Sequence, residues 1–164
     1  MVPPLAFYVH CPNYSGILLV FRAKSFPSGE DLGEALLLHD AARPFVSQEI
    51  IANVCQALEE HEAVVVAIPS TDTVYEMVDG NVARIPNRST IMRAQTPQAF
   101  RLPLIAEAYT KALGVNDLSA AACKEAHLPA TDDCGVVFSH MPHVPIHIVL
   151  GEEQNRKITF KEDI

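Results

Sequence analysis

The sequence predicts an α/β protein with a Rossmann-like, mostly parallel sheet from which a β-arm protrudes. Short apolar runs at 35–39, 63–68 and 144–151 are typical of strands that are buried on both faces of a sheet. Segments with helical spacing of apolar residues, at 47–58 and 101–113, alternate with these runs. Such alternation favours crossover connections and therefore a parallel sheet.

Composition limits the classes of partner. With 164 residues, the chain has the length of one domain. Its net charge of -8 provides no basic surface for a nucleic-acid polymer. The four cysteines are scattered and form no C-x-x-C pair, as expected for reduced thiols. The apolar run at 16–21 is too short to span a bilayer, so we interpret it as a strand. We therefore expect a cytoplasmic protein that contacts neither nucleic-acid polymers nor membranes.

The first regular strand, 35–39, ends in the sequence HDAARP. Asp40 and Arg43 then lie where the carboxyl edge of an open α/β sheet binds ligands. A carboxylate here suits a sugar hydroxyl or a metal-bound phosphate, and the guanidinium suits an anion. The same residues also fit a plain strand end followed by a solvated turn. Ser47 is the predicted N-cap of the helix that follows, with Ile50, Ile51, Val54, Ala57 and Leu58 at helical spacing.

A β-arm is predicted after the second strand, 63–68. Two semi-alternating segments flank Asp79-Gly80, a pair that is typical of hairpin turns. The apolar residues of the two segments are Val74, Met77, Val78, Val82 and Ile85. Because an isolated two-stranded hairpin is marginally stable in water, we expect the arm, 71–95, to pack against a second copy of the chain.

The next segment, 85–100, is interpreted as a polar loop around Pro97, in which Arg88 and Arg93 offer charge and Thr96 offers a hydroxyl. Such a mixture suits phosphate recognition, although polar loops with a proline are common.

The remaining elements are predicted from local signals. Helices are expected at 101–113 and 116–128, with Gly114 near the break. Thr131 is the predicted N-cap of a further helix, with two aspartates in its first turn. A strand is expected at 144–151, and residues 155–164 are expected to form another strand and the start of a helix. Three histidines, His140, His143 and His147, share no evident ligand face, which disfavours a metal site.

The chain divides by composition at residue 34. Residues 1–34 contain Pro3, Pro4, Pro12 and Pro27 and show little rhythm of strands and helices. We therefore predict an atypical N-terminal segment, 1–34, and a regular domain over 35–164.

Five segments occur in an order that resembles one enzyme family: LLLHDAARPFV, IPSTDTV, NRSTIMRAQTPQAF, TDDCGVV and NRKIT. The family is that of the 2-C-methyl-D-erythritol 4-phosphate cytidylyltransferases, together with their ribitol-5-phosphate cytidylyltransferase relatives. The resemblance covers residues 35–164, which would then be part of a cytidylyltransferase domain.

The resemblance implies roles for particular residues. Asp40 and Lys157 correspond to catalytic residues, and Asp40 also to the metal site, with Mg²⁺ as the implied cofactor. The implied substrate-binding residues are Arg43, Thr73, Arg88, Thr96 and Thr131. Of these, Thr73 and Arg88 would reach the polyol phosphate of the partner subunit in a homodimer.

The implied reaction is attack of a polyol phosphate on the α-phosphorus of CTP, with release of pyrophosphate. Positioning and charge neutralisation dominate this chemistry, so the absence of a nucleophile motif is consistent with it. The implied small-molecule partners are CTP and a polyol phosphate, with methylerythritol phosphate preferred over ribitol phosphate.

One segment of the family pattern is missing. Members carry a glycine-rich loop for the CTP phosphates before HDAARP, whereas Gly16, Gly29 and Gly33 are too dispersed to form one. The closing helix of the family is also absent before Ile164. We therefore expect a fold truncated relative to the family, and the alternative to an enzyme is a catalytically inactive fragment for polyol-phosphate binding or dimerisation.

Overall fold

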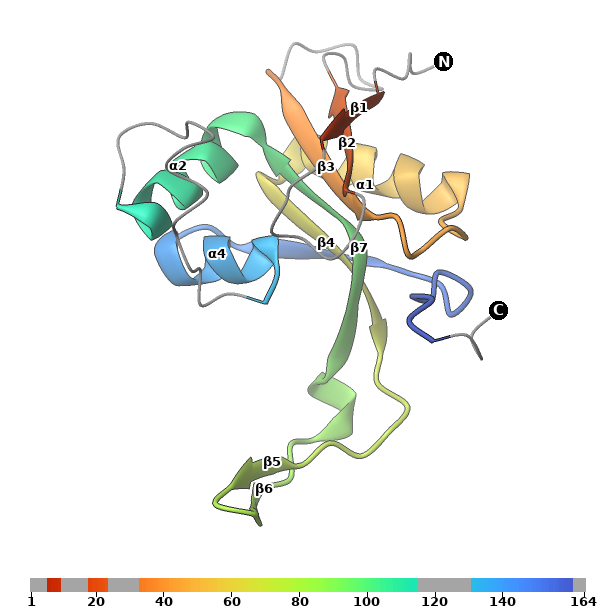
Figure 1. Ribbon diagram of the computed structural model, residues 1–164, viewed down its shortest axis with the longest axis vertical. Coiled ribbons are helices and arrows are strands. Elements are labelled where there is room, and N and C mark those ends of the chain that lie inside the picture. The colour runs from red at the N-terminus through yellow and green to blue at the C-terminus, as the bar shows by residue number, and fades with distance from the viewer. Residues whose placement is uncertain (1–5, 10–17, 24–32, 115–130, 161–164) are drawn as a thin grey trace.

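The computed structural model describes residues 6–9, 18–23, 33–114 and 131–160. A six-stranded sheet forms its centre, in the order β1-β2-β3-β7-β4-β8 (Figure 1). The bounds of these strands are β1 Ala6–Val9, β2 Leu18–Ala23, β3 Ala35–Asp40, β7 Met92–Arg101, β4 Ala63–Pro69 and β8 Ile146–Leu150. Two of them, β1 and β2, lie within the predicted N-terminal segment, and the run at 16–21 overlaps β2 as expected.

Helices cover both faces of the sheet, which confirms the Rossmann-like α/β class (Figure 1). On one face lies α1, Gln48–Glu60, and on the other lie α2, Leu102–Leu113, and α4, Asp133–His140. Alternate strand residues point to opposite faces. Leu37 accordingly packs in the cluster under α1, and Leu38 packs in the cluster under α2 and α4.

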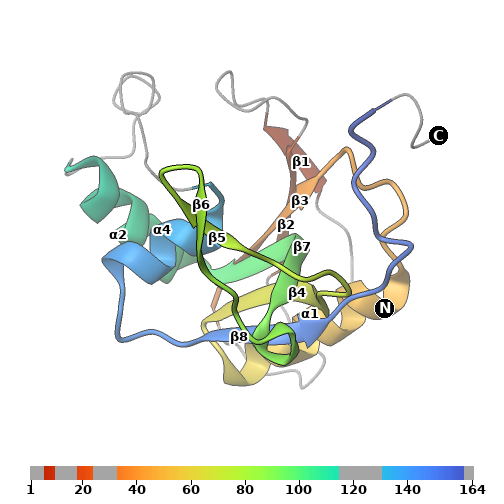
Figure 2. The same ribbon diagram turned by 90° about the horizontal axis from the view of Figure 1, so that it is seen from below.

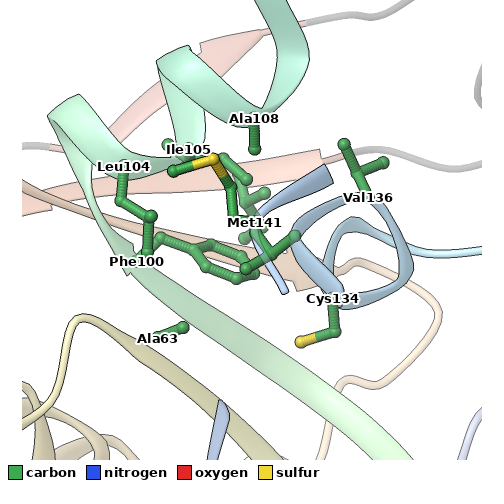
Figure 3. Close-up of a cluster of buried hydrophobic side chains, with 10 residues drawn as sticks. Ala63, Phe100, Leu104, Ile105, Ala108, Cys134, Val136 and Met141 are labelled. Atoms are coloured by element: carbon green, nitrogen blue, oxygen red, sulfur yellow. The ribbon is translucent and has the colours of Figure 1, made fainter. Parts of the chain in front are cut away.

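The two clusters explain why the strands are apolar throughout. Under α2 and α4, the fully buried ring of Phe100 packs among Leu104, Ile105, Ala108 and Met141 (Figure 3). The neighbouring residue on β7, Ala99, faces the α1 cluster instead. Both faces of the central strands are therefore covered by helices and shielded from solvent, as the sequence pattern indicated.

The sheet is mixed rather than mostly parallel. β3 and β4 run in the same direction, but β7 lies between them and is antiparallel to both. Within the described strands, the parallel neighbours are β4 and β8. The difference arises because part of the segment predicted as a polar loop, 85–100, is strand β7, whose side chains at Gln95 and Gln98 are buried polar groups.

β7 contains an irregularity at the Thr96–Pro97 pair. Val65 pairs with Gln98 and Val66 pairs with Gln95, so Thr96 and Pro97 are extra residues on this strand. An insertion of this kind redirects side chains and disrupts the ladder locally. The irregularity lies beside the end of β3 and presents the Thr96 hydroxyl to it.

The predicted cap of α1 is confirmed. The Ser47 side chain accepts a hydrogen bond from the backbone N–H of Ile50, and Ile50, Val54 and Leu58 are buried. The helix predicted at 101–113 is also confirmed and ends at Gly114, whose φ of 64° is left-handed. The helix predicted at 116–128 lies outside the described residues.

Two local predictions are wrong. The N-cap of α4 is Asp132, not Thr131, because the Asp132 carboxylate accepts the N–H of Gly135 and so occupies the capping position. Residues 155–160 form no strand. They follow the β3–α1 loop, with the Ile158 N–H donating to the carbonyl of Ala42, and residues 161–164 lie outside the description.

The protruding β-arm is confirmed. Its hairpin consists of β5, Glu76–Val78, and β6, Asn81–Arg84, and it extends away from the sheet (Figure 1). Asp79 and Gly80 form the turn with φ values of 50° and 79°. A short 3-10 helix, Arg88–Thr90, precedes the return into β7. Among the described residues, no helix is long and apolar enough to cross a membrane.

Candidate functional site

The candidate site lies at the end of β3, where Asp40 meets Lys157. Lys157 Nζ lies 2.7 Å from Asp40 Oδ2. The other carboxylate oxygen, Oδ1, accepts the N–H of Ala42 at 3.2 Å. The backbone N–H of Asp40 donates to Thr96 Oγ1 at 3.0 Å. Three of the predicted residues are therefore brought together from segments far apart in the sequence.

The charge of Asp40 is maintained by these contacts. Partial burial by itself would raise the pKa of the carboxyl group. The hydrogen bond from Lys157, the Ala42 N–H and the charges of Lys157 and Arg43 outweigh burial, so the pKa lies below its ordinary value. The site thus presents a carboxylate and an adjacent cation.

His39 precedes this carboxylate and is buried. Its Nε2 lies 2.9 Å from the carbonyl oxygen of Arg43, which can only accept, so Nε2 carries a proton. Its Nδ1 lies 3.0 Å from Thr96 Oγ1, and that hydroxyl already accepts the Asp40 N–H and donates its own proton to Nδ1. Burial lowers the pKa of His39, consistent with this neutral tautomer.

Arg43 joins the end of β3 to the C-terminal loop. Its Nη1 donates to the backbone carbonyl of Asn155 at 2.9 Å. Figure 2 shows the segment after β8 turning back beside the loop that follows β3. Part of the guanidinium predicted to bind phosphate is therefore engaged within the chain, and its buried Nε has no partner among the described residues.

Asn155 is a site residue that sequence reasoning missed. It is fully buried, and its Nδ2 donates to the carbonyl of Thr96 at 2.8 Å and to Gln95 Oε1 at 3.2 Å. A buried amide near the end of an apolar strand has no distinctive spacing. The sequence signal that could have identified Asn155 is its place two residues before Lys157 in the NRKIT segment.

Thr131 lies at the start of α4, next to a capped helix end tied to β7. Gln98 Nε2 donates to Asp132 Oδ2 at 2.8 Å, and Gln98 Oε1 accepts the N–H of Cys134 at 3.0 Å. Because Gln98 is two residues from Thr96, this network holds the α4 N-terminus beside the site strand. Thr131 itself is exposed.

Thr73 and Arg88 are not part of the cluster around Asp40 within one chain. Both are exposed and belong to the arm region, and Arg88 Nη1 donates to the carbonyl of Thr71 at 3.2 Å. The arm extends away from the sheet (Figure 1).

The fit of Asp40 to a divalent cation depends on its free lone pairs. Within the described part of the chain, Oδ2 pairs with Lys157 and Oδ1 accepts the Ala42 N–H, which leaves further acceptor capacity on both oxygens. Among the described residues, no group of three or more His, Cys, Asp or Glu side chains surrounds a common point. The arrangement fits Mg²⁺ held by one carboxylate and substrate phosphates, rather than a cage of protein ligands.

Comparison with known proteins supports a common family. The family model described as 2-C-methyl-D-erythritol 4-phosphate cytidylyltransferase matches residues 20–164, a range that starts before the expected 35. An enzyme of that name from Thermobifida fusca is 43% identical over 139 residues, which cover 82% of this chain and 52% of the relative. One from Bacillus licheniformis is 35% identical over 80% of this chain and 51% of the relative.

Solved structures give the same result. The 4-diphosphocytidyl-2C-methyl-D-erythritol synthase of Anaerococcus prevotii superimposes with a TM-score of 0.69 at 34% identity, covering 82% of this chain and 57% of that one. The 2-C-methyl-D-erythritol 4-phosphate cytidylyltransferase of Thermus thermophilus gives 0.60 at 32% identity, covering 79% and 57%. The chain spans about half the length of the curated relatives it matches. It belongs to the 2-C-methyl-D-erythritol 4-phosphate cytidylyltransferase family.

Proposed function

We propose that this chain carries the polyol-phosphate side of a cytidylyltransferase that transfers CMP from CTP to 2-C-methyl-D-erythritol 4-phosphate. The observation that carries the proposal is the ion pair of Asp40 and Lys157 at the end of β3, with the Thr96 hydroxyl and the Arg43 guanidinium beside it. The names of the relatives favour methylerythritol phosphate over ribitol phosphate as the acceptor.

In the proposed reaction, an oxygen of the polyol phosphate forms a bond to the α-phosphorus of CTP, and the bond from that phosphorus to the β-phosphate oxygen breaks. Pyrophosphate leaves with the electron pair. Lys157 is half exposed on the cluster, so its ammonium group can turn from Asp40 to a phosphate oxygen. Thr131 supplies an exposed hydroxyl group to the polyol. Thr96 Oγ1 donates its own proton to His39, so it offers the polyol one remaining lone pair as an acceptor.

Mg²⁺ is the proposed cofactor, held by Asp40. It would supply neutralisation of the phosphate charge. The residues of the chain supply the rest: Lys157 and Arg43 attract the anion, and the fixed Asp40 N–H···Thr96 contact sets the geometry of the strand end.

The proposed assembly is a homodimer in the cytoplasm, formed through the arm, 71–95. Val78 and Val82 on the arm hairpin are 61% and 57% exposed, and exposed apolar side chains on a hairpin are stabilised by a partner surface. Arm exchange would bring Thr73 and Arg88 of one chain to the polyol phosphate of the other. No nucleic-acid polymer or membrane is part of this proposal.

Isothermal titration calorimetry tests the proposal with two acceptors, methylerythritol 4-phosphate and ribitol 5-phosphate, each with Mg²⁺. We expect binding of the former to be tighter. Pyrophosphate release from CTP and methylerythritol phosphate then separates an enzyme from the alternative, a binding fragment without catalysis. Binding of neither polyol phosphate would refute the assignment of the site.

A further inference from the structure

We infer that Asn155 is a positioning residue, which holds the Lys157 loop against the end of β3 and thereby sets the Asp40–Lys157 contact. The inference rests on the proposed function, because it concerns the same site. In this inference, the neutral and fully buried Asn155 connects three segments: the end of β3, strand β7 and the loop that carries Lys157.

The side-chain amide of Asn155 binds two acceptors on β7. One proton of Nδ2 goes to the Thr96 carbonyl at 2.8 Å, and the other goes to Gln95 Oε1 at 3.2 Å. The Thr96 carbonyl belongs to the irregularity of β7 that presents the Thr96 hydroxyl to Asp40 and His39, and Gln95 directly precedes it. The amide thus fixes the loop to the same short stretch that contacts the carboxylate.

The backbone of Asn155 makes the second connection. Its carbonyl accepts from Arg43 Nη1 at 2.9 Å, and its N–H donates to the carbonyl of Glu152 at 3.0 Å. Three residues later, the Ile158 N–H donates to Ala42 at 2.7 Å. Lys157 therefore lies between two contacts to the β3 loop, one with the side chain of Arg43 and one with the carbonyl of Ala42, so a displacement of Asn155 would also move Lys157.

The acceptor Gln95 is itself held in place. Gln95 Nε2 donates to the carbonyl of Glu152 at 2.9 Å, which leaves Oε1 directed at Asn155. Gly151 leaves room for this arrangement, because a Cβ at that position would collide with Gln95 Oε1 and approach Val66 Cγ1 to 2.7 Å. The side-chain amides of Gln95 and Asn155 therefore pack closely against Gly151 and the loop that carries Lys157.

The chemistry of position 155 requires two donors on a short side chain. Aspartate has the same shape but would present an acceptor to two acceptors, and leucine would leave the Thr96 carbonyl and Gln95 Oε1 without their donor. Both substitutions should release the loop from β7. The functional consequence should appear at Lys157, although that residue is unchanged.

The test compares Asn155→Leu and Asn155→Asp with the parent chain, and with Asn53→Asp as a control that makes the same chemical change on the exposed face of α1. Calorimetry with methylerythritol 4-phosphate should show affinity reduced roughly tenfold or more for both position-155 variants. The control should bind as the parent does. Parental affinity in folded Asn155→Leu would overturn the inference.

Amide hydrogen exchange separates positioning from general loss of stability. In the position-155 variants, exchange at the backbone N–H of Asp40 and Ile158 should accelerate, whereas exchange at Val54, buried in the middle of α1, should stay near the parental rate. Equal acceleration at all three amides would overturn the inference. Should Asn155→Leu fail to fold, Asn155→Ser, which keeps one donor, replaces it under the same criteria.

The exchange experiment uses no ligand, so it also distinguishes two failures. If the parent chain binds no methylerythritol phosphate but the Asp40 and Ile158 amides accelerate selectively, the proposed function fails and the positioning role of Asn155 stands. If the parent binds and the amides are unaffected, the function stands and the positioning role fails.

Discussion

Lys157 Nζ lies 2.7 Å from Asp40 Oδ2 and joins the C-terminal loop to the end of β3. Half of the Lys157 side chain is exposed, so the pair contributes little to stability, about 1 kcal/mol or less. The functional effect of the pair is to place the Lys157 ammonium group beside Asp40. For Lys157→Met we therefore expect a nearly unchanged midpoint of thermal unfolding but a loss of about 1.5 to 3 kcal/mol in binding methylerythritol phosphate. Calorimetry and thermal unfolding measure the two quantities, and unchanged affinity would remove Lys157 from the site.

His39 predicts a pH dependence of stability. Burial lowers its pKa from the ordinary value of 6.5, so the folded chain binds a proton less readily than the unfolded chain. The stability due to neutral His39 is therefore fully present above pH 6.5 and is lost as the pH falls through the interval down to the folded-state pKa. In urea unfolding from pH 7.5 to 5.5, the parent should lose more stability than His39→Gln. Parallel curves for the two proteins would contradict the prediction.

The local parts of the fold were predictable because their causes are local. Ser47 caps α1, Gly114 ends α2, and Asp79-Gly80 turns the arm, each through the conformational preference of one or two residues. The α4 cap was missed by one residue because Thr131 and Asp132 are both good caps. Which of the two residues caps the helix depends on Gln98 of β7, which donates a hydrogen bond to the carboxylate of Asp132.

The arrangement of the site was less predictable because it depends on contacts between distant segments. β7 contains Gln95, Thr96 and Pro97, which resemble a loop until their buried partners are known. Asp40, Arg43 and Thr96 were indicated by the residue pattern, the resemblance assigned roles to them and to Lys157, and the four residues lie together in the structure. Asn155 begins the NRKIT segment, but its role in connecting the other segments becomes evident only from its buried partners.

Arg88 should affect ligand binding although it lies on the arm, away from Asp40. If an arm arginine reaches the partner's polyol phosphate, Arg88→Ala removes a charge-assisted hydrogen bond and weakens binding by about 1.5 to 3 kcal/mol. Arg84→Ala is the matched control, since Arg84 is also an exposed arm arginine but pairs with Glu76 within the hairpin. Calorimetry on the two variants tests the role, which is wrong if both bind as the parent does.

The final prediction concerns the arm, 71–95, as the contact between two chains. Val78 and Val82 lie on the two strands of a hairpin whose side chains are exposed in the isolated chain. Burying an apolar side chain of this size against a partner contributes about 1.5 to 3 kcal/mol, so several such residues can hold a dimer together. Val82 pairs with Met77 and Val78 pairs with Asn81, so replacing both valines by aspartate places one charge on each face of the hairpin, and desolvating these charges would oppose association.

We therefore expect sedimentation velocity to show a dimer for the parent chain at tens of micromolar, roughly the concentration at which an interface of moderate dissociation constant is occupied. The double variant Val78→Asp, Val82→Asp should sediment as a monomer. Because the hairpin lies outside the sheet and packs against neither core cluster, this variant should keep the circular dichroism of the parent. Ile148→Asp on β8 is a control for the general effect of adding a charge to an exposed apolar position, and it should remain dimeric. A monomeric parent, or a double variant that remains a dimer, would show that the arm does not join two chains.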